Sequence, residues 1–337
     1  MNLRRLAVRL VSTVAVASGW TARVHRRRHR QGDFRIHILE YHGVEDGPER
    51  EGVVSTQRFR QHLRFLKDRY RTVTVEEAAR RLASGHLDGD LLVLTFDDGY
   101  RDNHRCAWPV LQEQGMTGTI YLTTGFLDGH PLWFDTARRS FEALARQGPL
   151  PDSVQQALHA ALDEIPPPGQ EVNRLKYASA EDRLRVTELV DEAATDLPRR
   201  EVAQPMSWDE ARELRDGGVE LGAHTVRHPI LSRLSREEQH REIVGSRDRL
   251  AEELGASPAT FAMPNGSRRD FDDHTLQVLR DLDFLAACTT VRGSNTVGCE
   301  LHTLRRVGIG SDTSRVLAAR LAGLFDEGLR KMWRRRV

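Results

Sequence analysis

The sequence predicts an α/β fold built on parallel strands, either an α/β barrel or a doubly wound sheet. Short apolar runs alternate with amphipathic helical stretches along most of the chain, as parallel strands joined by right-handed crossovers require. The run Leu91–Phe96 is almost wholly apolar, which is typical of a strand buried on both faces. At 337 residues the chain is long enough for one large domain or two ordinary ones.

Seven segments are predicted as strands because each is a short apolar run followed by a turn or polar residue. In chain order they are residues 35–40, 91–96, 119–123, 219–223, 260–263, 284–287 and 304–309. Helices are expected between most of them. The first three are residues 56–70, 75–84 and 107–114, and a last helix is expected over residues 313–333. In the first of these helices Phe59, Leu63 and Leu66 recur at helical spacing.

Residues 136–205 interrupt the alternation of strands and helices. They are rich in Ala, Glu, Arg and Leu and are punctuated by two proline-containing turns. We expect two or three helices there, forming an insertion between barrel strands. A surface elaboration is favoured, and a cap over the site is the alternative.

Composition excludes several functional classes. Fifty basic and 49 acidic residues give a net charge of +1, so no overall field favours nucleic acid as a partner. The hydrophobic fraction of 39% and charged fraction of 29% are typical of a globular protein. The three cysteines, Cys106, Cys288 and Cys299, are too widely spaced for a disulfide framework or a cysteine-ligated zinc site.

Both ends of the chain are basic. Residues 1–32 hold eight arginines and no carboxylate, and residues 330–336 hold four more arginines and a lysine. Residues 6–20 are mostly apolar but shorter than the ~20 residues of a transmembrane helix. They resemble a short signal peptide or an amphipathic helix lying on a membrane. Because residues 23–30 are heavily basic, export is disfavoured, and peripheral contact at the cytoplasmic face of a bacterial membrane is slightly favoured over it.

Polar residues collect where predicted strands end. The carboxyl ends of parallel strands converge on one face of such folds, so these residues are expected to share one site. Each motif alone is a common turn or a chance pair, and it is their joint occurrence that predicts the site. The motifs are Asp97-Asp98, His224 with His228, Pro264-Asn265-Gly266, and His42.

The residue types in these motifs suit hydrolytic metal chemistry. Two imidazoles and one carboxylate leave an open position for water, as in catalytic zinc sites. Bound zinc lowers the pKa of water to about 7, and a second carboxylate can accept the proton. Neighbouring side chains of an extended segment point to opposite sides, so one aspartate can bind the metal while the other faces the water.

The motifs resemble those of the polysaccharide deacetylases of the NodB-homology type, carbohydrate esterase family 4. Residues 95–100 (Thr-Phe-Asp-Asp-Gly-Tyr) are similar to the first motif, residues 221–228 to the second and residues 261–266 to the third. The resemblance runs over residues 36–309, with the insertion poorly covered. It divides the chain into a basic N-terminal segment (1–32), a deacetylase domain (33–312) and a C-terminal helix with a basic tail (313–337).

The resemblance implies a deformed (β/α) barrel of about seven parallel strands that removes N-acetyl groups from amino sugars. Asp97 is then the base, and the backbone N–H of Asn265 stabilises the oxyanion. Zinc is the expected metal, with nickel, cobalt or manganese as alternatives. Its implied ligands are Asp98, His224 and His228. Residues implied to contact the N-acetylated glycan are Pro264, Asn265, Gly266 and Tyr100. Trp133 and Phe134 are further candidates for a wall that stacks against sugar rings, and a place in the core is the alternative for both.

The chain departs from the family pattern at three motifs, and one of them, the tryptophan-bearing fourth motif, is not recognisable. Ala262 stands where the family often has an arginine that orients the base, and Arg306 is a candidate substitute from a neighbouring strand. An ordinary surface or ion-pair arginine is the alternative for Arg306. The motif that supplies the general acid is not recognisable, so His42 and His302 are both candidates. His42 is preferred because it ends a predicted strand.

Three functions remain open from sequence. The favoured one is metal-dependent amide hydrolysis on a glycan. The second is a non-catalytic, membrane-associated glycan-binding or assembly protein on the same fold; a pure binder has no need of Asp97, which counts against this reading. The third keeps the chemistry but changes the substrate to an O-acetyl ester or a non-sugar amide.

Overall fold

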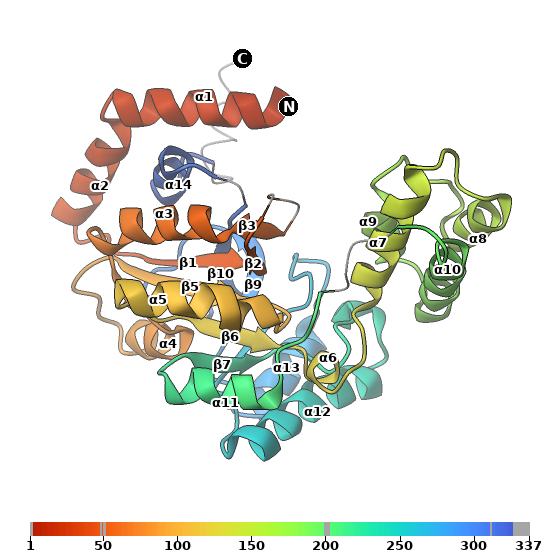
Figure 1. Cartoon of the computed structure of the whole chain (residues 1–337). Coiled ribbons are helices and arrows are strands. Elements are labelled where there is room, and N and C mark those ends of the chain that lie inside the picture. The colour runs from red at the N-terminus through yellow and green to blue at the C-terminus, as the bar shows by residue number, and fades with distance from the viewer. Residues whose placement is uncertain (1–2, 48, 50–51, 199–202, 311, 326–337) are drawn as a thin grey trace.

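The computed structural model describes residues 3–47, 49, 52–198, 203–310 and 312–325. Its centre is a closed barrel of seven parallel strands surrounded by helices (Figure 1). Around the barrel the strands follow the order β1-β10-β9-β8-β7-β6-β5, and β5 pairs with β1 to close it. They are β1 (Ile36–Tyr41), β5 (Leu91–Phe96), β6 (Thr119–Leu122), β7 (Glu220–Ala223), β8 (Thr260–Ala262), β9 (Ala286–Arg292) and β10 (Leu304–Gly308).

Closure of the barrel confirms the barrel prediction and excludes the doubly wound sheet. β1 pairs with β5 along its whole length, from Ile36–Leu91 to Tyr41–Phe96. The opposite edge of β5 is shared, because β4 (Arg71–Val73) pairs with its first half and β6 with its second. All seven predicted strands exist, and β9 extends to Arg292, five residues beyond its predicted end. A short parallel pair, β2 (Gly43–Glu45) and β3 (Val53–Ser55), follows β1.

The apolar run of β5 is buried on two sides, as predicted. Leu92 and Leu94 belong to the core between the barrel and its outer helices. Leu91 and Val93 belong to a second core with Tyr121 and the apolar face of α4 (Val75–Ala83). Because side chains alternate along a strand, Asp97 continues the face that holds Leu91, Val93 and Thr95. The other helices packed on the barrel are α3 (Thr56–Lys67), α5 (Trp108–Gln114), α6 (Thr124–Leu127), α11 (Trp208–Asp216), α12 (Arg236–Leu254), α13 (Asp273–Asp281) and α14 (Ser314–Leu321).

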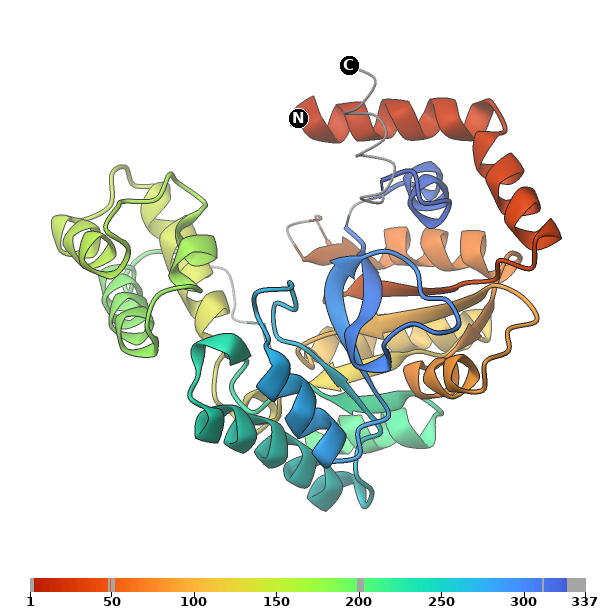
Figure 2. The same cartoon turned by 180° about the vertical axis from the view of Figure 1, so that it is seen from behind.

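The insertion is a separate bundle beside the barrel (Figures 1 and 2). It has four helices where two or three were expected. Phe141, Leu158, Leu175 and Val190 form the centre of an apolar core of its own. Its helices are α7 (Trp133–Ala145), α8 (Asp152–Leu162), α9 (Glu171–Leu175) and α10 (Ala180–Ala193).

The N-terminal segment forms two helices, α1 (Leu3–Ala17) and α2 (Trp20–Arg30). α1 packs against α14, and α2 leads the chain toward the start of β1 (Figure 2). Among the described residues no helix is long and apolar enough to span a membrane. The helix expected over residues 313–333 ends at Leu321, and the basic tail from residue 326 onward lies outside the described residues.

Candidate active site

The carboxyl ends of four barrel strands meet at one pocket, as the sequence predicted. β5 leads to Asp97 and Asp98, β7 to His224, β1 to His42 and β8 to Asn265. The pocket has a volume of about 340 Å³, and all of these side chains line it together with His228. Asp97, Asp98 and His224 are almost completely buried, so the pocket places charged groups where water screens them little.

Asp98, His224 and His228 are arranged as ligands of one ion. Asp98 Oδ1 lies 3.5 Å from His224 Nε2 and 3.4 Å from His228 Nε2. Two ligands of a tetrahedral zinc ion with bonds of about 2.0–2.1 Å lie roughly 3.3 Å apart. Asp98 Oδ1 is buried and has no hydrogen-bond partner among the described residues, so this oxygen is free to coordinate a cation. The donor set therefore fits a divalent metal.

The backbone around these residues is strained in a way that aims them inward. Asp98, Thr225 and His228 all have positive φ, at 78°, 65° and 56°. Such angles are uncommon for residues with a Cβ and cost about 1–3 kcal/mol each, which points to a functional constraint. The Thr225 hydroxyl oxygen accepts a hydrogen bond of 3.0 Å from the His228 N–H and holds this turn together.

Hydrogen bonding and burial set the protonation of the ligands. His224 Nδ1–H donates to the Ala262 carbonyl at 2.7 Å, which leaves the Nε2 lone pair facing Asp98. Burial lowers the pKa of His228 to about 4, so its imidazole is neutral at pH 7. Burial alone would raise the pKa of Asp98, but the imidazoles of His224 and His228 bring it below its usual range. Burial works to lower the pKa of His224, but its contact with Asp98 and the charge of Asp97 raise it, so a metal bound here would take the place of a proton on this imidazole.

Arg306 holds Asp97 with two parallel hydrogen bonds. Its Nη1 and Nη2 lie 2.7 Å from Oδ1 and Oδ2 of Asp97. The guanidinium is fully buried, and its Nε donates to the Thr289 carbonyl at 2.9 Å. Burial works to raise the pKa of Asp97, but the charges of Arg306 and His224 and the hydrogen bonds from Arg306 together lower that pKa below its usual range. Arg306 is thus not a surface arginine; it orients and ionises the aspartate from β10.

The two candidate acids lie at opposite ends of the barrel. His42 lines the pocket, and it forms a close group with Asp97 and Glu40 in which side-chain donor atoms lie within 4.8 Å of one another. His302 precedes β10, where its Nε2 contacts the Phe284 carbonyl at 2.8 Å. It does not line the pocket. Geometry therefore leaves His42 as the candidate within reach of the site.

The Pro264-Asn265-Gly266 segment forms a tight turn at the end of β8. Gly266 N–H donates to the Pro264 carbonyl at 2.7 Å, and φ is 58° at Asn265 and 61° at Gly266. A Cβ on Gly266 would lie 2.8 Å from the Thr290 nitrogen, so this position requires glycine. Of the three residues Asn265 lines the pocket.

The insertion contributes a wall of the pocket, so the interpretation as a mere surface elaboration is wrong. Trp133 and Phe134 line the pocket where α7 begins, and the Tyr100 hydroxyl donates to Asp135 Oδ2 at 2.8 Å. Trp133 also carries the Arg183 guanidinium 5.0 Å above its ring, so it serves both the pocket and the bundle.

Several pocket residues were not found from sequence. Lys176 reaches the pocket from the end of α9, and its Nζ lies 3.4 Å from Asn265 Oδ1. Glu40 lies 3.5 Å from Arg306 Nε. Glu40 carried a signal, because it lies two residues before His42 on the same strand. Lys176 carried none, because nothing local relates α9 to β8.

Comparisons with known proteins agree with this geometry. Residues 84–287, more than half of the chain, match the sequence profile of the family described as polysaccharide deacetylase. YxkH of Bacillus subtilis (strain 168), whose name assigns it to the polysaccharide deacetylases, is 38% identical over 90 residues. That match covers 26% of this chain and 32% of YxkH, so it spans about a third of the relative's length.

Solved structures share the fold. The deacetylase PplD of Streptococcus pyogenes, solved with acetate, has a TM-score of 0.58 at 22% identity and covers 85% of this chain and 98% of its own. IcaB of Ammonifex degensii has a TM-score of 0.59 at 21% identity, over 86% of this chain and 97% of its own. A de-N-acetylase of Aggregatibacter actinomycetemcomitans has a TM-score of 0.54 at 16% identity, over 83% and 96%.

Proposed function

This chain belongs to the polysaccharide deacetylase family, and we propose that it removes N-acetyl groups from amino sugars of a polysaccharide or cell-surface glycan. The observation that carries the proposal is the pairing of two adjacent aspartates in different environments. Asp98 faces two imidazole nitrogens, whereas Asp97 is held by a guanidinium. One carboxylate is therefore placed for a metal and the other for a proton.

Asp98, His224 and His228 are the residues that would hold a divalent cation, and zinc suits this donor set best, with nickel, cobalt or manganese as alternatives. When bound, the ion supplies Lewis acidity that activates water near neutral pH and polarises a carbonyl. The second imidazole nitrogen of His224 is tied to the Ala262 carbonyl, which fixes the direction of its ligating atom.

Asp97 accepts the proton of the attacking water. Arg306 keeps it ionised yet occupies only part of its hydrogen-bonding capacity, since a carboxylate offers about four lone-pair sites. The backbone N–H of Asn265 is proposed to stabilise the oxyanion of the tetrahedral intermediate. His42, which lines the pocket close to Asp97, is proposed to protonate the departing amine.

Two substitutions and a substrate panel test this function. Acetate release is measured on N-acetylated oligosaccharides, O-acetyl esters and small amides, with and without chelator, alongside bound metal per chain. We expect release from the N-acetylated glycans that chelator abolishes. Asp97→Asn should keep the metal in the pocket but release acetate about 100-fold more slowly or not at all. His224→Ala should lose the metal of the pocket.

Other outcomes assign other functions. Release from esters alone would replace the amide substrate, and bound metal without release from any substrate would favour a glycan-binding or assembly role.

The N-terminal helices favour a position at a membrane surface, which we propose is its cytoplasmic face. α1 exposes Leu6, Leu10 and Val14 along one side, with Leu10 64% and Val14 58% exposed. The adjoining α2 is strongly basic and ends in Arg27, Arg28, His29 and Arg30. An apolar stripe beside cationic side chains suits anionic lipid. Co-sedimentation with vesicles containing phosphatidylglycerol tests this, and Leu10→Glu should weaken it; binding unchanged by that substitution would contradict the proposal.

A further inference from the structure

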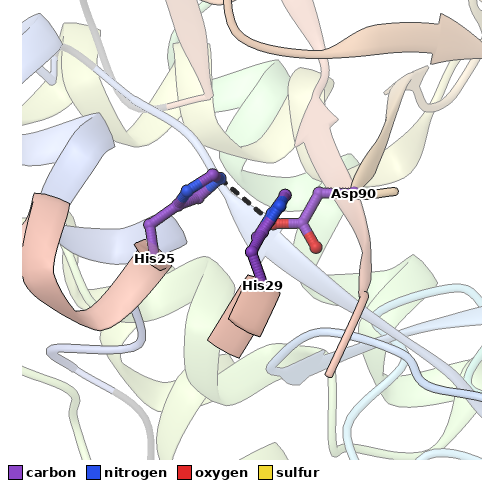
Figure 3. A group of neighbouring side chains, drawn as sticks. All are labelled: His25, His29 and Asp90. Carbon is purple, nitrogen blue, oxygen red and sulfur yellow. Dashed lines mark ion pairs between the residues drawn. The ribbon is translucent and has the colours of Figure 1, made fainter. Parts of the chain in front are cut away.

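A second group of metal-ligating side chains lies at the other end of the barrel. His25 and His29 stand four residues apart on α2 and so share one face of that helix. Asp90 immediately precedes β5, whereas Asp97 immediately follows it, so the group and the pocket lie at opposite ends of the same strand. Figure 3 shows both imidazoles turned toward the carboxylate of Asp90.

The distances in this group match those of the pocket ligands. Asp90 Oδ2 lies 3.5 Å from His25 Nε2 and 3.2 Å from His29 Nε2. Ligands of a tetrahedral zinc ion lie roughly 3.3 Å apart. The two rings stack with centroids 4.0 Å apart, which brings both Nε2 atoms to the same oxygen.

Unpartnered buried nitrogens provide a second, independent indication. Among the described residues the buried Nε2 atoms of His29 and His37 have no hydrogen-bond partner. His37 lies on β1 with only 2% of its side chain exposed, and its Nε2 points at Asp90 Oδ2 from 3.9 Å. A buried polar atom without a partner is unfavourable, and an ion shared by these nitrogens would give each of them a partner.

The charges around the group permit a cation. Arg28 Nη2 donates to Asp90 Oδ2 at 2.7 Å and the Arg35 N–H donates to Oδ1 at 2.8 Å, which together fix the carboxylate. Lone pairs remain on a carboxylate that makes two hydrogen bonds. Asp33 Oδ2 lies 3.8 Å from Arg28 Nε, so a second carboxylate offsets the charge of that guanidinium.

We propose that His25, His29 and Asp90 form a second divalent-metal site of the zinc class, with His37 as the donor nearest a fourth position. Such a site is structural, because it links α2 to the start of β5 as a crosslink between the N-terminal segment and the barrel. The second site uses no residue of the pocket, so it can be tested independently of the proposed deacetylase activity.

Zinc stoichiometry of the full chain tests the site. The protein is stripped with chelator, dialysed, titrated with Zn²⁺ alone and analysed for metal per chain. We expect two ions in the wild type, one in His25→Gln/His29→Gln and one in His224→Gln. His86→Gln, which removes an exposed imidazole from the loop before Asp90, is the matched control and should keep two.

Thermal unfolding and activity provide further readouts. Zn²⁺ should raise the melting temperature of His224→Gln but raise that of His25→Gln/His29→Gln less than in the wild type, because only the former keeps the crosslink. Acetate release by the double histidine variant should stay within about twofold of wild type, while Zn²⁺ no longer protects its N-terminal segment from proteolysis. A single zinc ion in the wild type that is lost in His224→Gln, or two ions in the double histidine variant, would overturn the proposal.

Discussion

Arg306 on β10 orients the carboxylate of Asp97. The resemblance placed the arginine with this role on β8. Ala262 stands where the family often has an arginine, and the guanidinium of Arg306 contacts Asp97 instead. Sequence could offer Arg306 as a candidate, because it follows a strand pattern. It could not choose between a buried and a surface arginine, since that depends on which way β10 faces in the closed barrel.

Arg306→Lys is expected to lower acetate release at pH 7 by about 10- to 100-fold and to move the acidic limb of its pH profile upward. A lysine offers a single point charge in place of two aligned donors, so the carboxylate of Asp97 is less stabilised and its pKa rises. A base with a raised pKa is ionised only at higher pH. Initial rates between pH 5 and pH 9 provide the measurement.

The control for this variant is Arg212→Lys, at a surface arginine that pairs with Asp209 and Glu253. It should leave both rate and profile unchanged. A lower rate for Arg306→Lys with an unmoved profile would mean that Arg306 acts on something other than the ionisation of Asp97.

At the scale of elements, the strands and the presence of a helical insertion were predictable, but the contact between the insertion and the pocket was not. Strands such as β5 are buried on both sides, so burial alone produces an apolar run that sequence reveals. β4 is only three residues long and was missed, because so short a segment shows no period. The insertion's helices could be expected from composition, but their contact with the pocket depends on packing between distant segments.

Trp133→Ala is expected to raise the KM for N-acetylated oligosaccharides by about 3- to 10-fold, because an aromatic ring against a sugar or another ring is worth about 0.5–1.5 kcal/mol. The indole lies at the start of α7, where it lines the pocket. The kcat for a small N-acetyl substrate should change little. Steady-state kinetics on substrates of increasing length measures the effect.

Trp208→Ala provides the matched control, because Trp208 lies on α11, donates its indole N–H to Asp128 at 2.9 Å and does not line the pocket. An equal rise of KM in both variants would indicate a general loss of packing. A KM that is unchanged in Trp133→Ala would remove the tryptophan from the substrate wall.

For the whole molecule, a buried histidine ties the C-terminal segment to the barrel and makes stability depend on pH. His62 on α3 lies 3.2 Å from the Tyr41 hydroxyl through Nδ1 and 2.7 Å from the Asp312 carbonyl through Nε2. With Nε2–H donating and Nδ1 accepting, the neutral ring satisfies both contacts. Burial lowers the pKa of His62 below its ordinary value.

The free energy of unfolding is therefore expected to fall as pH drops below about 6.5, the pKa of histidine in an unfolded chain. In that window the unfolded chain binds a proton on His62 that the folded chain does not, so the contribution of His62 to stability is complete above about pH 6.5 and decreases below it by at most about 1.4 kcal/mol per pH unit. Urea denaturation at pH 7.5, 6.5 and 5.5 measures the slope. His62→Gln should flatten it and the exposed His86→Gln should not; an identical slope in all three proteins would contradict the assignment.

A small apolar cluster of Tyr100, Phe126 and Leu132 lies where the helical insertion joins the barrel. The insertion has a separate apolar core of its own. The residues at the strand ends and the wall formed by the insertion thus come from different segments of the chain. Changes in the length or sequence of the bundle would therefore alter this wall of the pocket without moving the aspartates and histidines at the strand ends. In this architecture the wall that would select the substrate can change separately from the residues that carry the chemistry.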